Sequence, residues 1–294
     1  NESVYTGTRS KKPKLLKPMS HQFKRKSKRW VSATETRNYV CKDGLVDWLK
    51  KYGKRGRKFS DSTFKNTFKD CIFKKGNEFE TSVVNLLKRD HEVVSISEFY
   101  NKEKIRETER CMREGIPIIH SAPISNKKNN TYGIIDLLIR SDYINRIFEV
   151  DPLNIEEVNK NAPKLDLPFH YVVIDIKYST IPLCSNGKSI RNSGWFPAYK
   201  SQTLIYNNAI GNMQGYTPPQ TFILGRGWSL TRKGVNYKGR SCLERLGEIN
   251  YTNWDDTYKS KTNSAIKWIR SVHENGAKWS ISPPSRDELY PNMC

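Results

Sequence analysis

The chain has 294 residues, of which 36% are hydrophobic and 11% aromatic. This composition is typical of a folded protein and excludes a wholly disordered chain. No apolar run approaches the roughly 20 residues that span a bilayer, and the first residues form no apolar signal core. We therefore expect no membrane partner and no secretion. The expected location is intracellular, in the cytoplasm or nucleus of a host cell, or associated with a virus.

The formal net charge of +21 is unevenly distributed: residues 1–75 hold 22 Lys and Arg against 6 Asp and Glu. A basic head on a nearly balanced body favours a polyanionic partner, most often nucleic acid. We interpret residues 1–29 as a basic flexible arm and residues 30–75 as a basic N-terminal helical segment. The arm's Lys24–Arg29 cluster could direct nuclear entry, follow phosphates or only aid solubility.

Helical and extended patterns alternate along the remainder of the chain. We expect residues 76–294 to contain both helices and strands. Residues 142–150 are predicted to be the hairpin partner of the strand at 132–140, and residues 151–169 a polar connection. The predicted helices after residue 30 are 39–49, 76–88, 101–114, 197–211 and 255–275. The predicted strands are 116–119, 132–140, 171–178 and 221–224, with a hairpin or loop at 232–240.

The strand at 171–178 is the most informative stretch, because it places an acid and a base inside an apolar run. Side chains alternate along a strand, so Asp175 and Lys177 project from the same face, about 7 Å apart. Burying such a pair is costly unless other groups compensate. A structural ion pair would explain it, as would a site that holds a metal ion and a phosphate.

Three further features accompany this pair in chain order. Glu80 lies on the apolar side of the predicted helix at 76–88, whereas Glu78 faces water. Asp136 sits between Ile135 and Leu137 in a predicted buried strand. Gln202 and Tyr206 are four residues apart and therefore share one helix face. Each feature alone has an ordinary structural explanation, but together they indicate a site.

Hydrolysis of a phosphodiester requires charge neutralisation, an activated water and a stabilised leaving oxygen. Mg²⁺ or Mn²⁺ would supply much of this, and such hard cations prefer oxygen ligands. Asp136, Asp175 and the backbone carbonyl of Ile176 are the candidate metal ligands, with Glu80 completing the shell directly or through water. Lys177 would orient the attacking water, and we expect burial and the metal to lower its pKa.

These residues resemble the motifs of the PD-(D/E)xK nuclease superfamily. Asp136 matches the first strand acid, Asp175-Ile-Lys177 the acid-x-Lys element, and Glu80 the helix acid. Gln202-Thr-Leu-Ile-Tyr206 is similar to the Gln-x3-Tyr motif of the RecB-like and lambda-exonuclease-like branch, which includes the CRISPR-associated single-strand exonucleases. The resemblance covers about residues 32–228. It implies a restriction-endonuclease-like α/β core at residues 76–294, with a central mixed sheet flanked by helices. It also implies catalytic roles for Glu80, Asp136, Asp175, Lys177, Gln202 and Tyr206.

The resemblance implies a metal-dependent DNA exonuclease with little sequence specificity, and with single-strand endonuclease activity as a further capacity. Its partners would be single- or double-stranded DNA, further copies of the chain in a dimer or ring, and a helicase in the same pathway. The CRISPR-associated relatives hold an iron–sulfur cluster on one early cysteine and three clustered late ones. This sequence lacks such a triplet, so we expect no iron–sulfur cluster.

Several basic residues are predicted to follow the DNA backbone, while aromatic residues such as Trp30 could stack bases or pack in the core. The main alternative to a nuclease is a non-catalytic, basic nucleic-acid-binding protein on a decayed nuclease fold. The intact Asp136, Asp175 and Lys177 favour the enzyme. The candidate DNA contacts are Arg55, Arg57, Lys200, Arg226, Arg232 and Lys233.

Overall fold

The computed structural model describes residues 28–53, 63–97 and 99–292. The predicted arm at 1–29 therefore lies almost entirely outside the described residues. Within them, eight strands form one mixed sheet in the order β2-β3-β4-β5-β6-β7, with β1 beside β4 and β8 beside β6. The strands are β1 Val31–Ser32, β2 Val93–Ser95, β3 Ile118–Asn126, β4 Thr131–Arg140, β5 Tyr171–Leu183, β6 Gln220–Arg232, β7 Val235–Gly239 and β8 Gly247–Asn250.

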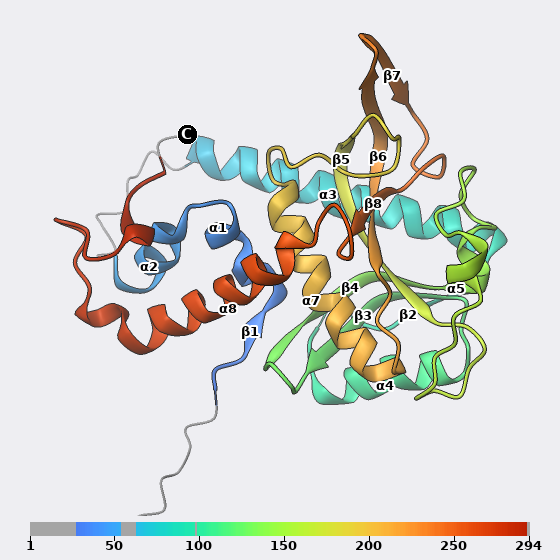
Figure 1. Ribbon diagram of the computed structural model, residues 1–294, viewed down its shortest axis with the longest axis horizontal. Helices are drawn as coiled ribbons and strands as arrows, with labels where there is room; N and C mark the ends of the chain where they lie inside the picture. Colours follow the sequence, from blue (N-terminus) through green and yellow to red (C-terminus); the bar gives the residue numbers. More distant parts are fainter. Residues whose placement is uncertain (1–27, 54–62, 98, 293–294) are drawn as a thin grey trace, which may run out of the picture.

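Helices cover both faces of this sheet (Figure 1), which confirms the expected mixed α/β architecture with an N-terminal helical segment. Val83 and Leu87 of α3 pack on one face, whereas α4, α7 and α8 contribute to the core on the other. The α-helices are α1 Arg37–Val40, α2 Gly44–Tyr52, α3 Thr63–Asp90, α4 Lys102–Arg113, α5 Ser141–Ile144, α6 Ile155–Val158, α7 Phe196–Gln214 and α8 Thr257–Asn275. Short 3-10 helices are η1 Ala33–Thr36, η3 Gly276–Lys278 and η4 Asp287–Leu289.

Two strand pairings place the predicted site. The pair β4 and β5 is antiparallel, whereas β5 and β6 are parallel. Parallel neighbours need a crossover, and α7 provides it between β5 and β6. As predicted, β5 is deeply buried over Tyr171–Ile174, with apolar side chains on both faces.

The predicted helix start at residue 76 is wrong, because α3 runs as one helix from Thr63 to Asp90, across the predicted division between residues 75 and 76. Gly76, the predicted helix start, lies mid-helix with open space around it. A glycine at an exposed helical position costs only about 1 kcal/mol, which a long packed helix tolerates. The N-terminal helices also share the main core, since Val31, Ala33 and Trp48 belong to it.

The predicted hairpin partner at 142–150 is also wrong. This stretch forms α5 and a series of turns, and β3 and β5 are the antiparallel neighbours of β4. Its buried residues Ile144, Ile147 and Phe148 recur three and four apart, which is helical rather than strand spacing. The polar connection at 151–169 contains the short helix α6 and leads directly into β5.

The alternation of side chains is interrupted once on each of the two strands β3 and β4. Ile119 and Ala122 pack in the same core cluster, as do Ile135 and Leu138, although residues three apart should face opposite sides. The interruption lies at Ser121 and Asp136, the facing pair that is missing from the ladder between these strands. Ser121 has a φ of 50°, a left-handed conformation that is uncommon for a residue with a Cβ. The sheet is therefore distorted at the strand acid.

No helix in the described parts of the chain has the length and apolar character needed to cross a membrane.

His170, which precedes β5, gives a pH-dependent contribution to stability. It is fully buried, its Nδ1 lies 2.9 Å from the Lys160 carbonyl oxygen, and burial lowers its pKa from 6.5. As pH falls through 6.5, the unfolded chain gains a proton that the folded chain does not bind. The free energy of unfolding should then decrease, by at most about 1.4 kcal/mol per pH unit for one proton.

Urea unfolding between pH 7.5 and 5.5 should show this slope, and His170→Phe should reduce it. His273 also has a lowered pKa, through burial and then Arg29 and Lys51, so His273→Gln is the matched variant. It should leave the part due to His170 in place. An unchanged slope in His170→Phe would contradict the assignment.

Candidate active site

Asp136 of β4 and Asp175 of β5 lie side by side at the point where the hydrogen-bonded pairing of these two strands ends. The ladder between these strands ends at Leu137 and Ile174, so Asp136 and Asp175 occupy the next facing positions. The Asp136 Oδ2 atom accepts a hydrogen bond from the Ile176 backbone N–H at 2.6 Å. The side chain thus takes the place of a ladder partner. In a strand the N–H and C=O of one residue point to the same side, so the Ile176 carbonyl also faces Asp136.

Asp175 and Lys177 form an ion pair on the same face of β5, with 2.7 Å between the Lys177 Nζ and Asp175 Oδ2 atoms. Asp175 is completely buried, whereas the Lys177 side chain is 20% exposed. The Lys177 ammonium also lies 5.0 Å from the centre of the Tyr199 ring. The register of β5 against β6 shifts by one residue between Lys177 and Thr180. Such a bulge re-aims side chains and is common beside active sites.

Helix α7 supplies Gln202 and Tyr206 to the same place. The Gln202 amide donates to Asp175 Oδ1 at 3.3 Å and to the Tyr206 hydroxyl oxygen at 2.9 Å. The Tyr206 ring lies against Gly133 on β4, where the Cβ of any other residue would come within 2.5 Å of Cε1. Gly133 therefore allows helix and strand to approach closely, and α7 holds Asp175 in position.

Glu80 approaches from α3 on the opposite face of the sheet, and its neighbour is a residue that the sequence did not indicate. Its Oε1 atom lies 3.1 Å from Nε2 of His120 on β3, while His120 Nδ1 lies 3.0 Å from the Ser95 hydroxyl. Glu80, His120 and Asp136 line a cavity of about 460 Å³. The expected inward direction of Glu80 is confirmed, and Glu78 instead pairs with exposed Lys75. A lone histidine near a strand carried no signal in the sequence.

The electrostatics of the cluster follow from two carboxylates around one ammonium. Burial, and then Asp175, raise the pKa of Asp136 well above its ordinary value, while Lys177 opposes this. Burial alone would lower the pKa of Lys177, but Asp175 and Asp136 together outweigh it and raise that pKa. The two carboxylates thus raise the pKa of Lys177 where burial alone would lower it, and the expected effect of a metal stays a prediction. Two nearby carboxylates hold the proton on the amine more strongly than burial removes it.

The cluster offers the kind of ligand atom that a divalent cation binds, but too few acidic or histidine side chains in the described part of the chain converge on one point. Asp136, Asp175 and the Ile176 carbonyl offer the oxygen atoms that Mg²⁺ and Mn²⁺ prefer. Among the described residues, however, no three His, Cys, Asp or Glu side chains converge closely enough to hold a metal ion. Glu80 is directed to His120, and the Lys177 ammonium occupies the space beside Asp175. The metal site therefore stays a prediction.

The predicted DNA contacts divide into three groups. Lys200 is wrong, because its ammonium is buried and bonded to Asp255 Oδ1 at 2.6 Å and to the Ile190 carbonyl at 2.7 Å. The Lys200 side chain points to the buried side of α7, away from solvent. Three other basic residues are exposed, and two of them, Arg232 and Lys233, lie at the tip of the β6–β7 hairpin. The third is Arg226, on β6 near the exposed Tyr178. Arg55 and Arg57 lie outside the described residues.

No known protein-family model matches this chain, and no curated protein is significantly similar to it. The chemistry of the carboxylate cluster is therefore the main guide to function.

The buried Lys200–Asp255 pair should matter for stability rather than for nucleic-acid binding. Lys200→Met leaves the Asp255 carboxylate buried without its cation, and should lower the free energy of unfolding by about 3–5 kcal/mol. Combining Lys200→Met with Asp255→Asn should recover part of this loss, because no unpaired charge remains. Urea denaturation measures both effects. A stable Lys200→Met protein with weakened DNA binding would contradict the structural role.

Proposed function

We propose that the protein is a metal-dependent nuclease that hydrolyses phosphodiester bonds in DNA with little sequence specificity. The observation that carries this proposal is the Asp136 carboxylate bonded to the Ile176 N–H beside the Asp175–Lys177 pair. This arrangement supports the resemblance to the PD-(D/E)xK superfamily, in which an acid on one strand faces an acid-x-Lys element on the next. An exonuclease is the favoured type because Gln202 and Tyr206 meet the same cluster.

A purely structural explanation of the cluster leaves one carboxylate without a counter-charge. Asp136 and Asp175 share the single Lys177 ammonium, and burial and proximity disfavour a second negative charge. A divalent cation beside Asp136, Asp175 and the Ile176 carbonyl would remove this penalty. Such an ion would neutralise phosphoryl oxygens and lower the pKa of a bound water. Among the acids, Glu80 is placed to reach this position only through water or after leaving His120.

Lys177 has the charge and the position to act on a phosphate. Its ammonium keeps its proton, because Asp175 and Asp136 raise its pKa. A protonated amine at the exposed end of the cluster would stabilise the negative charge that develops on the phosphorane. Gln202 would keep the Asp175 carboxylate in its orientation through the bond to Oδ1.

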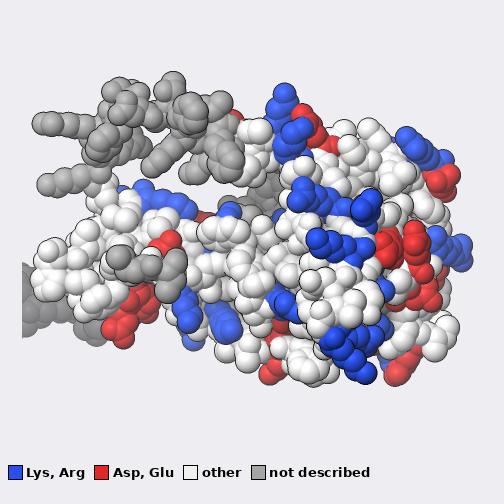
Figure 2. Space-filling view, turned by 90° about the horizontal axis from the view of Figure 1, so that it is seen from above, with Lys and Arg blue, Asp and Glu red and all other residues white. Residues whose placement is uncertain are grey.

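The surroundings offer a positive surface for a polyanion. The view from above in Figure 2 shows groups of Lys and Arg side chains on the face from which the β6–β7 hairpin projects. Arg226 follows the β6 residue that pairs with Lys177, and Arg232 and Lys233 are exposed further along this hairpin. Phosphate contacts of this kind support binding without sequence specificity.

The test is a cleavage assay on labelled single- and double-stranded DNA with Mg²⁺ or Mn²⁺. The wild-type protein should degrade DNA, and Asp136→Asn, Asp175→Asn and Lys177→Met should each lower the rate by on the order of 100-fold or more. Chelation of the metal should abolish cleavage. DNA left intact under both metals, despite binding, would contradict the enzyme and favour a non-catalytic nucleic-acid-binding protein.

Glu80 and Glu78 provide a matched pair on α3. Glu80→Gln should lower the cleavage rate, because this side chain lines the cavity with Asp136. Glu78→Gln should not, because the Glu78 side chain is 47% exposed and pairs, among the described residues, with Lys74 and Lys75 of its own helix. Equal effects of the two substitutions would show that Glu80 has no part in the site.

A further inference from the structure

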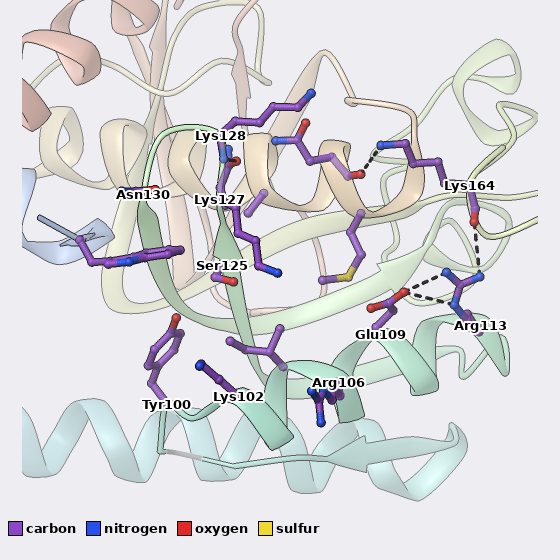
Figure 3. Close-up of a pocket in the computed structure, with 16 residues that line it drawn as sticks. Tyr100, Lys102, Arg106, Glu109, Arg113, Ser125, Lys127, Lys128, Asn130 and Lys164 are labelled. Atoms are coloured by element: carbon purple, nitrogen blue, oxygen red, sulfur yellow. Dashed lines mark hydrogen bonds and ion pairs between the residues drawn. The ribbon is translucent and has the colours of Figure 1, made fainter. Parts of the chain in front are cut away.

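A second, strongly basic groove lies beside α4, away from the carboxylate cluster. It has a volume of about 1160 Å³ and is bounded by α4, the end of α7 and the turn between β3 and β4 (Figure 3). Its basic lining residues come from three separate parts of the chain, whereas Glu109 is the single acid that lines it. These basic residues are Lys102, Arg106, Arg113, Lys127, Lys128 and Lys164.

Four of these residues are exposed and have no acidic partner among the described residues: Lys102, Arg106, Lys127 and Lys128. Glu109 is already engaged by Arg113 at 2.8 Å, and Arg113 also donates to the Lys164 carbonyl. Water screens the repulsion between these exposed like charges only in part, so the surface attracts anions. The helical rise places Lys102 and Arg106 about 6 Å apart along one side of α4. In Figure 3, Lys127 extends from the turn toward this helix.

Aromatic rings stand at one end of the groove. Trp30 and Tyr100 both line it, and each is 39% exposed. The Tyr100 ring packs on Tyr132 of β4 with 4.4 Å between ring centres. Exposed rings beside a row of cationic side chains are the combination with which proteins bind single-stranded nucleic acid, because nucleobases stack on the rings while phosphates meet the cations. A duplex keeps its nucleobases stacked inside and could not use these rings.

Strand β4 runs from the aromatic end of the groove to the candidate active site. Tyr132 and Ile134 are partly exposed and lie on one face of the strand. Ile134 lines the cavity that contains Asp136 and Glu80. Tyr132 and Asp136 are four residues apart, or about 13 Å along a strand. A strand of a few nucleotides would span this distance.

We propose that this groove binds single-stranded DNA without sequence specificity and leads it over β4 toward Asp136. Its role as a substrate path depends on the proposed nuclease function, whereas binding itself does not. The phosphates would contact the exposed Lys and Arg side chains of α4 and of the β3–β4 turn. Unpaired nucleobases would stack on Trp30 and Tyr100.

The test is fluorescence anisotropy with a labelled oligothymidine in excess chelator, so that cleavage cannot contribute. Lys102→Ala combined with Arg106→Ala should weaken binding roughly tenfold at moderate salt and lower the slope of log affinity against log salt by about 1.4, or 0.7 for each lost contact. The matched control is Lys267→Ala combined with Lys278→Ala, which removes two exposed basic residues from α8 and η3. The control should change affinity much less.

A substitution of both rings, Trp30→Ala with Tyr100→Ala, should weaken binding of oligothymidine but not of a hairpin duplex. Photocrosslinking of an oligonucleotide that carries bromodeoxyuridine should label the peptides containing Trp30 or Tyr100. Equal affinity of the Lys102→Ala, Arg106→Ala variant and its control would overturn the proposal. So would a ring substitution that weakens duplex binding as much as oligothymidine binding. Displacement of the oligonucleotide by polyglutamate at equal charge concentration would also overturn it. If the groove variants lose binding but the wild-type protein cleaves no DNA with Mg²⁺ or Mn²⁺, the groove proposal stands and the proposed nuclease function is wrong.

Discussion

The burial of two carboxylates at the point where β4 and β5 separate is the constraint on which the site depends. Asp136 and Asp175 cannot both be charged in an apolar sheet unless other groups offset the repulsion and the lost hydration. The Ile176 N–H, the Lys177 ammonium and the Gln202 amide offset part of this cost. Each comes from a different local feature: the end of a ladder, the same strand face and a crossover helix.

The distortions of the sheet follow the same constraint. The ladder between β3 and β4 is interrupted at Ser121 and Asp136, where the Asp136 carboxylate accepts from the Ile176 N–H and lines the cavity with Glu80. The bulge after Lys177 similarly changes the direction of β5 just beyond the ammonium. Local irregularity in an otherwise regular sheet is common at functional sites, because strain there is held by the surrounding packing.

The basic groove and the carboxylate cluster differ in how they handle charge. In the cluster, the charges are buried and close together, so small changes in position alter the pKa of each group. In the groove, the basic side chains are exposed and unmatched, and water screens their repulsion. Such a surface suits repeated, reversible contact with a polyanion. Strand β4 connects both regions, since it carries Tyr132 at one and Asp136 at the other.

The sequence by itself determined the elements and the candidate residues. Asp175 and Lys177 share a face because strand geometry requires it, and Gln202 and Tyr206 share one because helix geometry does. Periodicity also predicted both helices and strands, and the resemblance implied that they form a mixed sheet with flanking helices. Where these local signals were ambiguous, the predictions were wrong. A glycine can begin a helix or lie within one, and a short apolar run such as 142–150 is compatible with a strand as well as with helical turns.

Only the tertiary structure decided which residues meet. His120 joined Glu80 because β2 and β3 place it opposite α3, and no local pattern contains that pairing. The Lys200 side chain is buried because its ammonium pairs with Asp255, which lies 55 residues later in the chain. The groove gathers basic side chains from α4, the β3–β4 turn and the connection before β5. Local periodicity fixes the direction of a side chain on its own element, but contacts between elements depend on how the whole chain packs.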